Sequence, residues 1–351
     1  MADTKILLTG ATGYIGGAIL DALLDEDYVT LNRSNITCLV RGEKNAKAFA
    51  SKGVNTVLFN SLDNTEVLAN VASQHDIVIH AASGFHTLSA RALLLGLAQR
   101  KKKTGKEVYY LHTSGTSNVG DRPLTKEYIE TRFPLSDKEI NIYEYEKMRD
   151  ETVPYAQRTS DVVVTEVGQE YGVKTYILMS PSIYGIASSP LHEFSHTPKL
   201  IRLSLELGQA PVVGDGSAIW DHAHITDVAR VYKLIVAKIL EGADIPNGKN
   251  GTYFIQQGEH SWRELSQRVA EAGVALGALK TTELRSLTIQ EGAEKLAGGR
   301  SLLGEIGWAS NSRTRGVLAR ELGWEPKKTR ADFENHAIED WKNILADIQK
   351  A

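Results

Sequence analysis

Residues 9–17 read TGATGYIGG and follow directly on a short apolar run, KILLT, at residues 5–9. An apolar run of this length is typical of a fully buried parallel strand. After the glycines, residues 18–27 place apolar side chains at helical spacing. A strand, a glycine-rich turn and a helix in this order predict a loop that binds a dinucleotide.

Gly10, Gly13 and Gly16 would each have a separate task in such a loop. The first permits a tight turn, the second lets the backbone approach the pyrophosphate, and the third brings helix and strand together. The phosphates would then rest on the helix N-terminus. An ordinary strand-to-helix turn with incidental glycines is the alternative, and the flanking strand and helix favour the cofactor.

Strand and helix patterns alternate through the first half of the chain, which predicts an α/β fold with a Rossmann-type, doubly wound parallel sheet. Further strands are predicted at residues 36–40, 55–60, 76–82, 107–114 and 173–181. Helices are predicted at residues 90–103, from Pro154 to Gly172, and at 225–240. The predicted dinucleotide domain comprises residues 1–185 and a returning segment at about 221–258, and a smaller substrate lobe comprises 186–220 and 259–351.

Two segments lack a clear periodic pattern. Residues 120–154 form a long polar insertion, and long loops beside an active edge often act as lids. Residues 186–220 are rich in loop-forming residues, and the tail after residue 259 contains two further helical patterns, one of them at 332–348. We therefore expect a lid near the site and a small, partly helical second lobe.

Composition excludes several functions. The 351 residues carry a formal charge of -3, which argues against a nucleic-acid binder, and the basic run at residues 100–106 is explained as the end of a helix. Cys38 is the single cysteine, no apolar run approaches the roughly 18 residues of a membrane span, and the strand at Lys5 leaves no room for a signal peptide. We expect a cytoplasmic protein that binds neither nucleic acid nor membrane.

The end of the second predicted strand indicates which dinucleotide binds. An acidic residue there would hold the ribose 2′-hydroxyl of NAD, but this chain has Arg41, with Lys44 close behind. A guanidinium pairs with the 2′-phosphate that only NADP carries. The alternative is an exposed arginine in a polar loop. The sequence favours NADP(H).

Five stretches, in order along the chain, resemble the extended short-chain dehydrogenase/reductase superfamily. They are the TGxxGxxG loop, DIVIHAAS at 76–83, LHTSGTS at 111–117, MSPSIYG at 179–185, and the C-terminal HITDVARVY and LGWEP. Together with the loop chemistry, the resemblance implies a cofactor site formed by Gly10, Thr12, Gly13, Tyr14, Ile15, Gly16, Arg41, Lys44, Ser61, Leu62, Ala81, Ala82, Ser83, Thr113, Tyr155, Pro181 and Ile183.

The resemblance also implies a Ser-Tyr-Lys set in which tyrosine donates a proton while hydride arrives from the nicotinamide. Tyr143 and Lys147 match Tyr-x-x-x-Lys literally, but Pro154 would break the helix that must follow. Tyr155 lies 26 residues before Pro181, enough for one helix and one strand. We therefore assign the role to Tyr155.

At the lysine position, four residues after Tyr155, this chain has Thr159. Threonine can bond a ribose hydroxyl but supplies no charge, so the phenol should remain a proton donor near its usual pKa of about 10. Ser114 aligns with the catalytic serine, and Thr116 and Ser117 are near substitutes. These hydroxyls could equally satisfy local backbone in a turn.

Aromatic and imidazole side chains follow the predicted strands and suggest a pocket for a ring-bearing carbonyl compound. They are Phe85, His86, Tyr184, His192, Phe194 and Trp220. Core or capping roles explain each of them alone equally well. His192 and His196 have metal-like spacing, but prolines flank them and no third ligand is evident, so we expect no metal.

These patterns predict an atypical NADPH-dependent reductase of a small carbonyl-type substrate. One alternative is an NADP-binding sensor or regulatory protein without turnover, because the lysine is missing. Another is an isomerase, epimerase or dehydratase that uses the same pocket without net redox change. Apolar helix faces such as ALLLGLA at 92–98 allow a homodimer, although packing on the sheet explains them as well.

Overall fold

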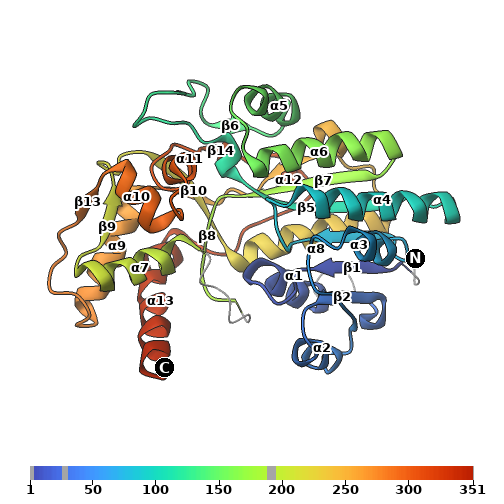
Figure 1. The fold of residues 1–351 in the computed structure, drawn as a ribbon, viewed down its shortest axis with the longest axis horizontal. Helices are drawn as coiled ribbons and strands as arrows, with labels where there is room; N and C mark the ends of the chain where they lie inside the picture. Colours follow the sequence, from blue (N-terminus) through green and yellow to red (C-terminus); the bar gives the residue numbers. More distant parts are fainter. Residues whose placement is uncertain (1–3, 26–30, 188–194, 351) are drawn as a thin grey trace.

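The computed structural model describes residues 4–25, 31–187 and 195–350. Its centre is a seven-stranded parallel sheet with strand order β11-β7-β5-β4-β1-β2-β3 (Figure 1). The strands are β1 (Ile6–Thr9), β2 (Ile36–Val40), β3 (Asn55–Leu58), β4 (Ile77–His80), β5 (Tyr109–Gly115), β7 (Lys174–Ser180) and β11 (Thr252–Phe254). From β1 the chain builds outward in both directions, which confirms the predicted Rossmann-type fold.

Helices cover both faces of this sheet. On one face, α1 (Tyr14–Leu24) packs against α8 (Ile225–Glu241); on the other, α4 (Thr87–Thr104) lies between α3 (Thr65–Ala72) and α6 (Ala156–Tyr171). Successive strand residues point to opposite faces. In β1, Ile6 and Leu8 therefore join the α1–α8 core, and Leu7 joins the α3–α4–α6 core.

Helix α2 (Glu43–Ala50) and helix α3 lie where the sequence analysis predicts no helix. All residues of α2 remain at least partly exposed, so the segment lacks the apolar stripe that would indicate a helix. Helix α1 also begins earlier than its apolar residues suggest, because it starts at Tyr14, inside the glycine-rich motif.

The segment predicted as a lid loop, residues 120–154, contains helix α5 (Ile142–Thr152) and strand β6 (Leu135–Ser136). Helix α5 packs against α6, and the side chain of Asn141 caps its N-terminus. Strand β6 pairs with β14 (Thr314–Arg315) in the C-terminal part of the chain. Tertiary contacts hold the second half of this polar segment in place, so the expectation of a long loop there is wrong.

The second lobe is more regular than predicted. It contains α7 (His196–Leu207), β9 (Pro211–Val213), α9 (Trp262–Ala275), β13 (Arg285–Leu287), α10 (Ile289–Leu296), α11 (Ser301–Ile306) and α13 (Arg330–Lys350), whereas α12 (Leu318–Glu321) packs against β11 of the large sheet. A three-stranded sheet of β8 (Ser182–Tyr184), β10 (Ile219–His224) and β12 (Gly258–Ser261) connects the lobe to the end of β7. Most of these elements are short and amphipathic, so their patterns fall below what sequence periodicity detects.

Figure 1 shows this lobe, with α7, α9, α10 and α13, at the end of the sheet opposite the N-terminus. The segment predicted to return to the first domain contains α8 and β11, which pack with the large sheet. The domain boundaries themselves stay a prediction. Among the helices of the described residues, none combines the length and apolar character that crossing a bilayer requires.

Candidate active site and cofactor cleft

The glycine-rich loop between β1 and α1 has no room for side chains at two of its positions. Gly10 adopts a φ of +77°, and a Cβ there would lie 2.5 Å from the carbonyl oxygen of Ala81. A Cβ on Gly16 would lie 2.1 Å from the carbonyl oxygen of Gly10. The loop therefore packs tightly between β4 and α1, and leaves the N–H groups of the first turn of α1 for an anion.

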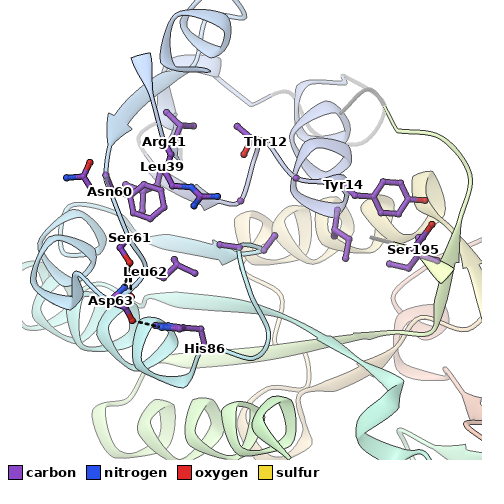
Figure 2. Close-up of a pocket in the computed structure, with 18 of the residues that line it drawn as sticks. Thr12, Tyr14, Leu39, Arg41, Asn60, Ser61, Leu62, Asp63, His86 and Ser195 are labelled. Carbon is purple, nitrogen blue, oxygen red and sulfur yellow. Dashed lines mark hydrogen bonds and ion pairs between the residues drawn. The ribbon is translucent and has the colours of Figure 1, made fainter. Parts of the chain in front are cut away.

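A cleft of about 620 Å³ opens above this loop (Figure 2). Twelve residues of the predicted cofactor set line it: Gly10, Thr12, Gly13, Tyr14, Ile15, Arg41, Ser61, Leu62, Ala81, Ala82, Pro181 and Ile183. They come from the ends of β1, β2, β3, β4 and β7, the edge of a doubly wound sheet at which ligands bind. The structure thus brings these distant segments together in one cleft.

Other predicted members lie outside the cleft wall. Gly16 packs against Gly10 from within α1, and Lys44 is exposed on α2. Ser83 accepts a hydrogen bond from the N–H of Phe85, and Thr113 accepts one from the Tyr232 hydroxyl in the core.

Sequence reasoning missed part of the cleft wall, namely Leu39, Val40, Phe59, Asn60, Asp63 and Ser195. Most of these residues lie at the end of β2 or in the connection from β3 to α3. Their position at the ends of predicted strands could have identified them from the sequence. His86 and His196 also line the cleft. His86 caps α4 and bonds Asp63 at 3.0 Å, as Figure 2 shows.

Arg41 is the first residue after β2 and lies at the rim of the cleft. Figure 2 places its side chain beside Leu39 and on the same side as Asn60. The guanidinium is exposed, and Asn45 holds the backbone carbonyl of Arg41 through a 2.8 Å hydrogen bond. The position at which NAD enzymes of this fold carry a carboxylate therefore carries a cation here.

Tyr155 lies at the N-terminus of α6 and is 7% exposed. Its hydroxyl lies 3.1 Å from Ser117 Oγ, and Ser117 in turn donates to Gln157 Oε1 at 2.8 Å. Because Ser117 has a single hydroxyl proton, Tyr155 is the donor of the first bond. Burial raises the pKa of the Tyr155 phenol above its ordinary value of 10.0, so the phenol keeps its proton at neutral pH.

Gln157 extends across the ends of two central strands. Its Nε2 would be 3.1 Å from a Cβ on Gly84, which follows β4, and 3.2 Å from a Cβ on Gly115, the last residue of β5. Thr159 instead donates to Asp150 Oδ2 of α5 at 2.8 Å. Tyr155 is the N-cap of α6: its carbonyl accepts the Thr159 N–H at 2.9 Å, but its own backbone angles are extended, so helical geometry does not set the direction of its side chain.

The predicted serine and threonine are both buried. Ser114 donates to Asp161 Oδ2 at 2.5 Å. Thr116 is fully buried, and its carbonyl accepts from Ser312. The hydroxyl that the structure brings to Tyr155 belongs to Ser117, which the sequence analysis named only as a substitute.

The competing pair, Tyr143 and Lys147, lies on α5. Both side chains bond Glu166 of α6, at 3.0 and 2.7 Å, and the Lys249 ammonium lies 4.8 Å from the centre of the Tyr143 ring. These bonds join the outer helices α5 and α6. Neither this pair nor Tyr155 belongs to the lining of the cleft, but Tyr155 lies beside the ends of the central strands, next to Phe85 and Ser117.

Among the predicted pocket residues, Phe85 packs edge-on against Tyr155, with ring centres 5.8 Å apart. Tyr184 and Trp220 are buried in the second lobe, where Trp220 donates to Ser310 Oγ. His192 and Phe194 lie outside the described residues. Phe85 is thus the predicted aromatic that reaches the candidate proton donor.

A parallel sheet of this topology, a glycine-rich anion loop and a tyrosine at the strand ends define a nicotinamide-dinucleotide protein of the extended short-chain dehydrogenase/reductase class. The chain belongs to the NAD dependent epimerase/dehydratase family, whose sequence pattern matches residues 6–247. This membership confirms the resemblance inferred from the sequence.

Individual relatives agree with the family. The chain is 31% identical over 343 residues to a protein named oxidase ucsJ from an Acremonium species, covering 92% of each chain. Its fold is similar to dTDP-glucose 4,6-dehydratase DesIV of Streptomyces venezuelae, solved with bound NAD (TM-score 0.66, 20% identity, 98% of both chains). It is also similar to UDP-glucose 4-epimerase of Thermotoga maritima (TM-score 0.62, 19% identity, 97% of this chain and 100% of the other).

Proposed function

We propose that the protein is an NADPH-dependent reductase of a small carbonyl-type substrate, such as a ketone, an enone or an imine. The observation that carries this proposal is the Tyr155 phenol, which is protonated and donates toward Ser117 at 3.1 Å beside the strand ends. A buried, protonated phenol suits a proton donor, and proton donation to oxygen or nitrogen is what a reductase needs.

The cofactor, when bound, supplies a hydride to the electrophilic carbon. Tyr155 gives its proton to the substrate oxygen or nitrogen, so that one hydride and one proton complete the two-electron reduction. Ser117 accepts the hydrogen bond of the Tyr155 phenol and so orients the proton donor, and Gln157 fixes the Ser117 oxygen by accepting its proton at 2.8 Å. Ser114, for which the alignment implied this task, is engaged by Asp161 instead.

The preference for NADPH rests on Arg41. Its exposed guanidinium lies at the rim of the cleft where the adenosine ribose of a dinucleotide would lie. A 2′-phosphate there would gain a charge-assisted pair with the arginine, and an unphosphorylated ribose would not. The structure of DesIV contains NAD, whereas we expect this chain to prefer NADPH.

The direction of the reaction follows from the lack of a lysine beside Tyr155. Gln157, at the ends of β4 and β5, carries no charge, and although the charges of Arg158 and Arg300 lower the pKa of the phenol, burial outweighs them and the pKa is raised. Tyr155 would thus serve poorly as the base that an alcohol oxidation needs. Reduction is the direction that this side-chain set supports.

The Tyr155→Phe variant tests the proton donor. We expect NADPH oxidation with a panel of ketones, enones and imines to fall by about 100-fold or more, the usual contribution of a general acid. Since the phenol has a raised pKa, wild-type kcat/KM should show no loss from Tyr155 deprotonation below about pH 9. NADPH consumption at 340 nm is the measurement.

Tyr143→Phe is the matched control, because it removes a phenol that bonds Glu166 outside the cleft. Its activity should stay within about twofold of wild type. Full activity of Tyr155→Phe, or equal losses in the two variants, would contradict the assignment of the proton donor.

The neutral Gln157 also supports a second candidate, a regulatory protein that binds NADP(H) without turnover. Tight NADPH binding by calorimetry together with no consumption across the panel would favour this alternative. Turnover of a single carbonyl compound would exclude it.

A further inference from the structure

A group of buried polar side chains lies between β5, α5 and α6 and has no part in the steps above. It consists of His112, Ser114, Asn118, Glu146 and Asp161, which we call the carboxyl cluster; each is at most 4% exposed. Two carboxyl groups so far from water are costly unless hydrogen bonds and proton sharing compensate them.

Asp161 is the acceptor at the centre of the carboxyl cluster. Its Oδ2 receives the Ser114 hydroxyl at 2.5 Å and the Asn118 amide at 2.7 Å, and His112 Nε2 lies 3.3 Å from its Oδ1. The same Asn118 amide donates to Glu146 Oε1 at 2.7 Å. Donors therefore converge on Asp161 from β5 and from the turn after it, and Glu146 of α5 accepts from the same Asn118 amide.

The two carboxyl groups are hydrogen-bonded to each other. Burial raises the pKa of both, to about 7 for Asp161 and more strongly for Glu146, for which the charge of Asp161 is the next cause. His112 brings no charge, because burial lowers its pKa to about 3. The Ser114 and Asn118 donors on Asp161 favour the arrangement in which Glu146 holds the proton and Asp161 is ionised.

The carboxyl cluster connects to both residues of the proposed proton donor pair. Asn118 follows Ser117 directly, and its carbonyl accepts from Arg158 Nε at 3.2 Å. Arg158 also bonds the carbonyl of Val153 at 3.1 Å, and its guanidinium lies 5.7 Å from the centre of the Tyr155 ring. Asn118 and Arg158 thus fix the two chain segments that meet at the Ser117–Tyr155 bond.

We propose that Asp161, ionised and bonded to a neutral Glu146, is a positioning residue that holds Ser117 and Tyr155 in register through Asn118. The proposal rests on the reductase function above. A displacement of about 1 Å at a reacting group can reduce turnover by about 100-fold, so a supporting residue of this kind can control the rate without touching substrate.

Replacement of each carboxyl group by its amide tests the proposal, because the two changes differ in chemistry. Asp161→Asn turns an NH2 group toward donors, so kcat should fall by about 100-fold while the dissociation constant of NADPH stays within about threefold. Glu146→Gln keeps an N–H donor in place of the acid O–H, so its kcat should stay close to that of wild type. Glu146→Ala removes the donor, and its kcat should be much lower. We therefore expect Asp161→Asn to lower kcat much more than Glu146→Gln does.

Asp221→Asn is the matched control for general loss of stability. Asp221 is 1% exposed and accepts the N–H and hydroxyl of Thr314 at 2.5 and 2.7 Å, away from the cleft. It should lower the melting temperature yet leave kcat near wild type. If Asp161→Asn, like the control, lowers the melting temperature but leaves kcat near wild type, or if Glu146→Gln lowers kcat as much as Glu146→Ala does, the proposal is wrong.

Two measurements do not depend on turnover. They show whether the proposed role of the carboxyl cluster is wrong even if the proposed reductase function is also wrong. The infrared difference spectrum between wild type and Glu146→Gln at pH 7 should show the loss of one protonated-carboxyl band, because the other buried carboxyl groups with raised pKa values, such as Asp221 and Asp340, contribute equally to both proteins and cancel. A difference spectrum without this loss would contradict the proton assignment. A crystal structure of Asp161→Asn should show the 3.1 Å Ser117–Tyr155 contact broken, and an intact contact would overturn the positioning role. A wild-type enzyme inactive on every substrate, with both readouts as expected, would refute the reductase alone.

Discussion

Arg41 is the single residue on which the choice of coenzyme depends. It stands at the end of β2 with an exposed guanidinium and contributes to the cleft wall. We expect Arg41→Glu to weaken NADPH binding by about 10- to 100-fold, the value of one charge-assisted hydrogen bond, and to leave NADH binding unchanged or improved. Titration calorimetry with both coenzymes measures this shift.

Lys47→Glu makes the same change of charge on the neighbouring helix α2, outside the cleft wall. The dissociation constant of NADPH should change by about threefold at most, because salt screens the charge of a residue that does not contact the cofactor. Equal effects of the two variants would show that the guanidinium does not contact the phosphate.

At the scale of elements, the contact between α1 and the turn before it sets the geometry of the phosphate site. A methyl group on Gly16 would overlap the carbonyl oxygen of Gly10 at 2.1 Å, so Gly16→Ala must push the helix away from the turn. We expect a loss of about 1–3 kcal/mol in unfolding free energy and a clear loss of NADPH affinity. Urea unfolding and calorimetric titration check the two effects.

Ala22→Gly changes one methyl group in the same helix and serves as the control, with a cost of up to about 1 kcal/mol and unchanged NADPH affinity. Equal NADPH affinities of Gly16→Ala and wild type would contradict the role given to this contact.

At the scale of the whole molecule, His196 joins the cofactor edge to the second lobe. Its Nε2–H donates to the carbonyl of Gly307 at 3.1 Å, and its Nδ1 accepts from Ser182 of β8 at 3.0 Å. Three indoles surround the ring, with ring centres at 4.8 to 5.4 Å; they belong to Trp220, Trp262 and Trp308. One side chain therefore couples β8, α7 and the core of the lobe.

His196→Ala should cost about 2–4 kcal/mol in unfolding free energy, because it leaves a cavity and two unpaired polar groups. Urea unfolding followed by tryptophan fluorescence reports on the surrounding indoles directly. His75→Ala removes a buried histidine at the end of α3 with one bond, to Val71, and should cost less and leave the fluorescence of the folded protein unchanged. A fluorescence spectrum of folded His196→Ala identical to that of wild type would contradict this role.

The sequence alone indicated the β1–loop–α1 unit and the doubly wound parallel sheet, because local periodicity and glycine chemistry suffice for both. Twelve residues of the cleft wall followed from the glycine loop together with the family resemblance. Tyr155 was preferred to Tyr143, since a proline separates Tyr143 from the helix that leads to β7. These inferences use short sequence stretches whose local structure adjacent residues set among themselves.

Only the tertiary structure decided which side chains meet Tyr155. Ser117, from the turn after β5, bonds the Tyr155 hydroxyl, Phe85, from the segment after β4, packs against its ring, and Gln157 is linked to it through Ser117. The carboxyl cluster likewise joins α5, α6 and β5 across tens of residues. Contacts between segments that far apart arise from packing of whole elements, and no local pattern in the sequence records them.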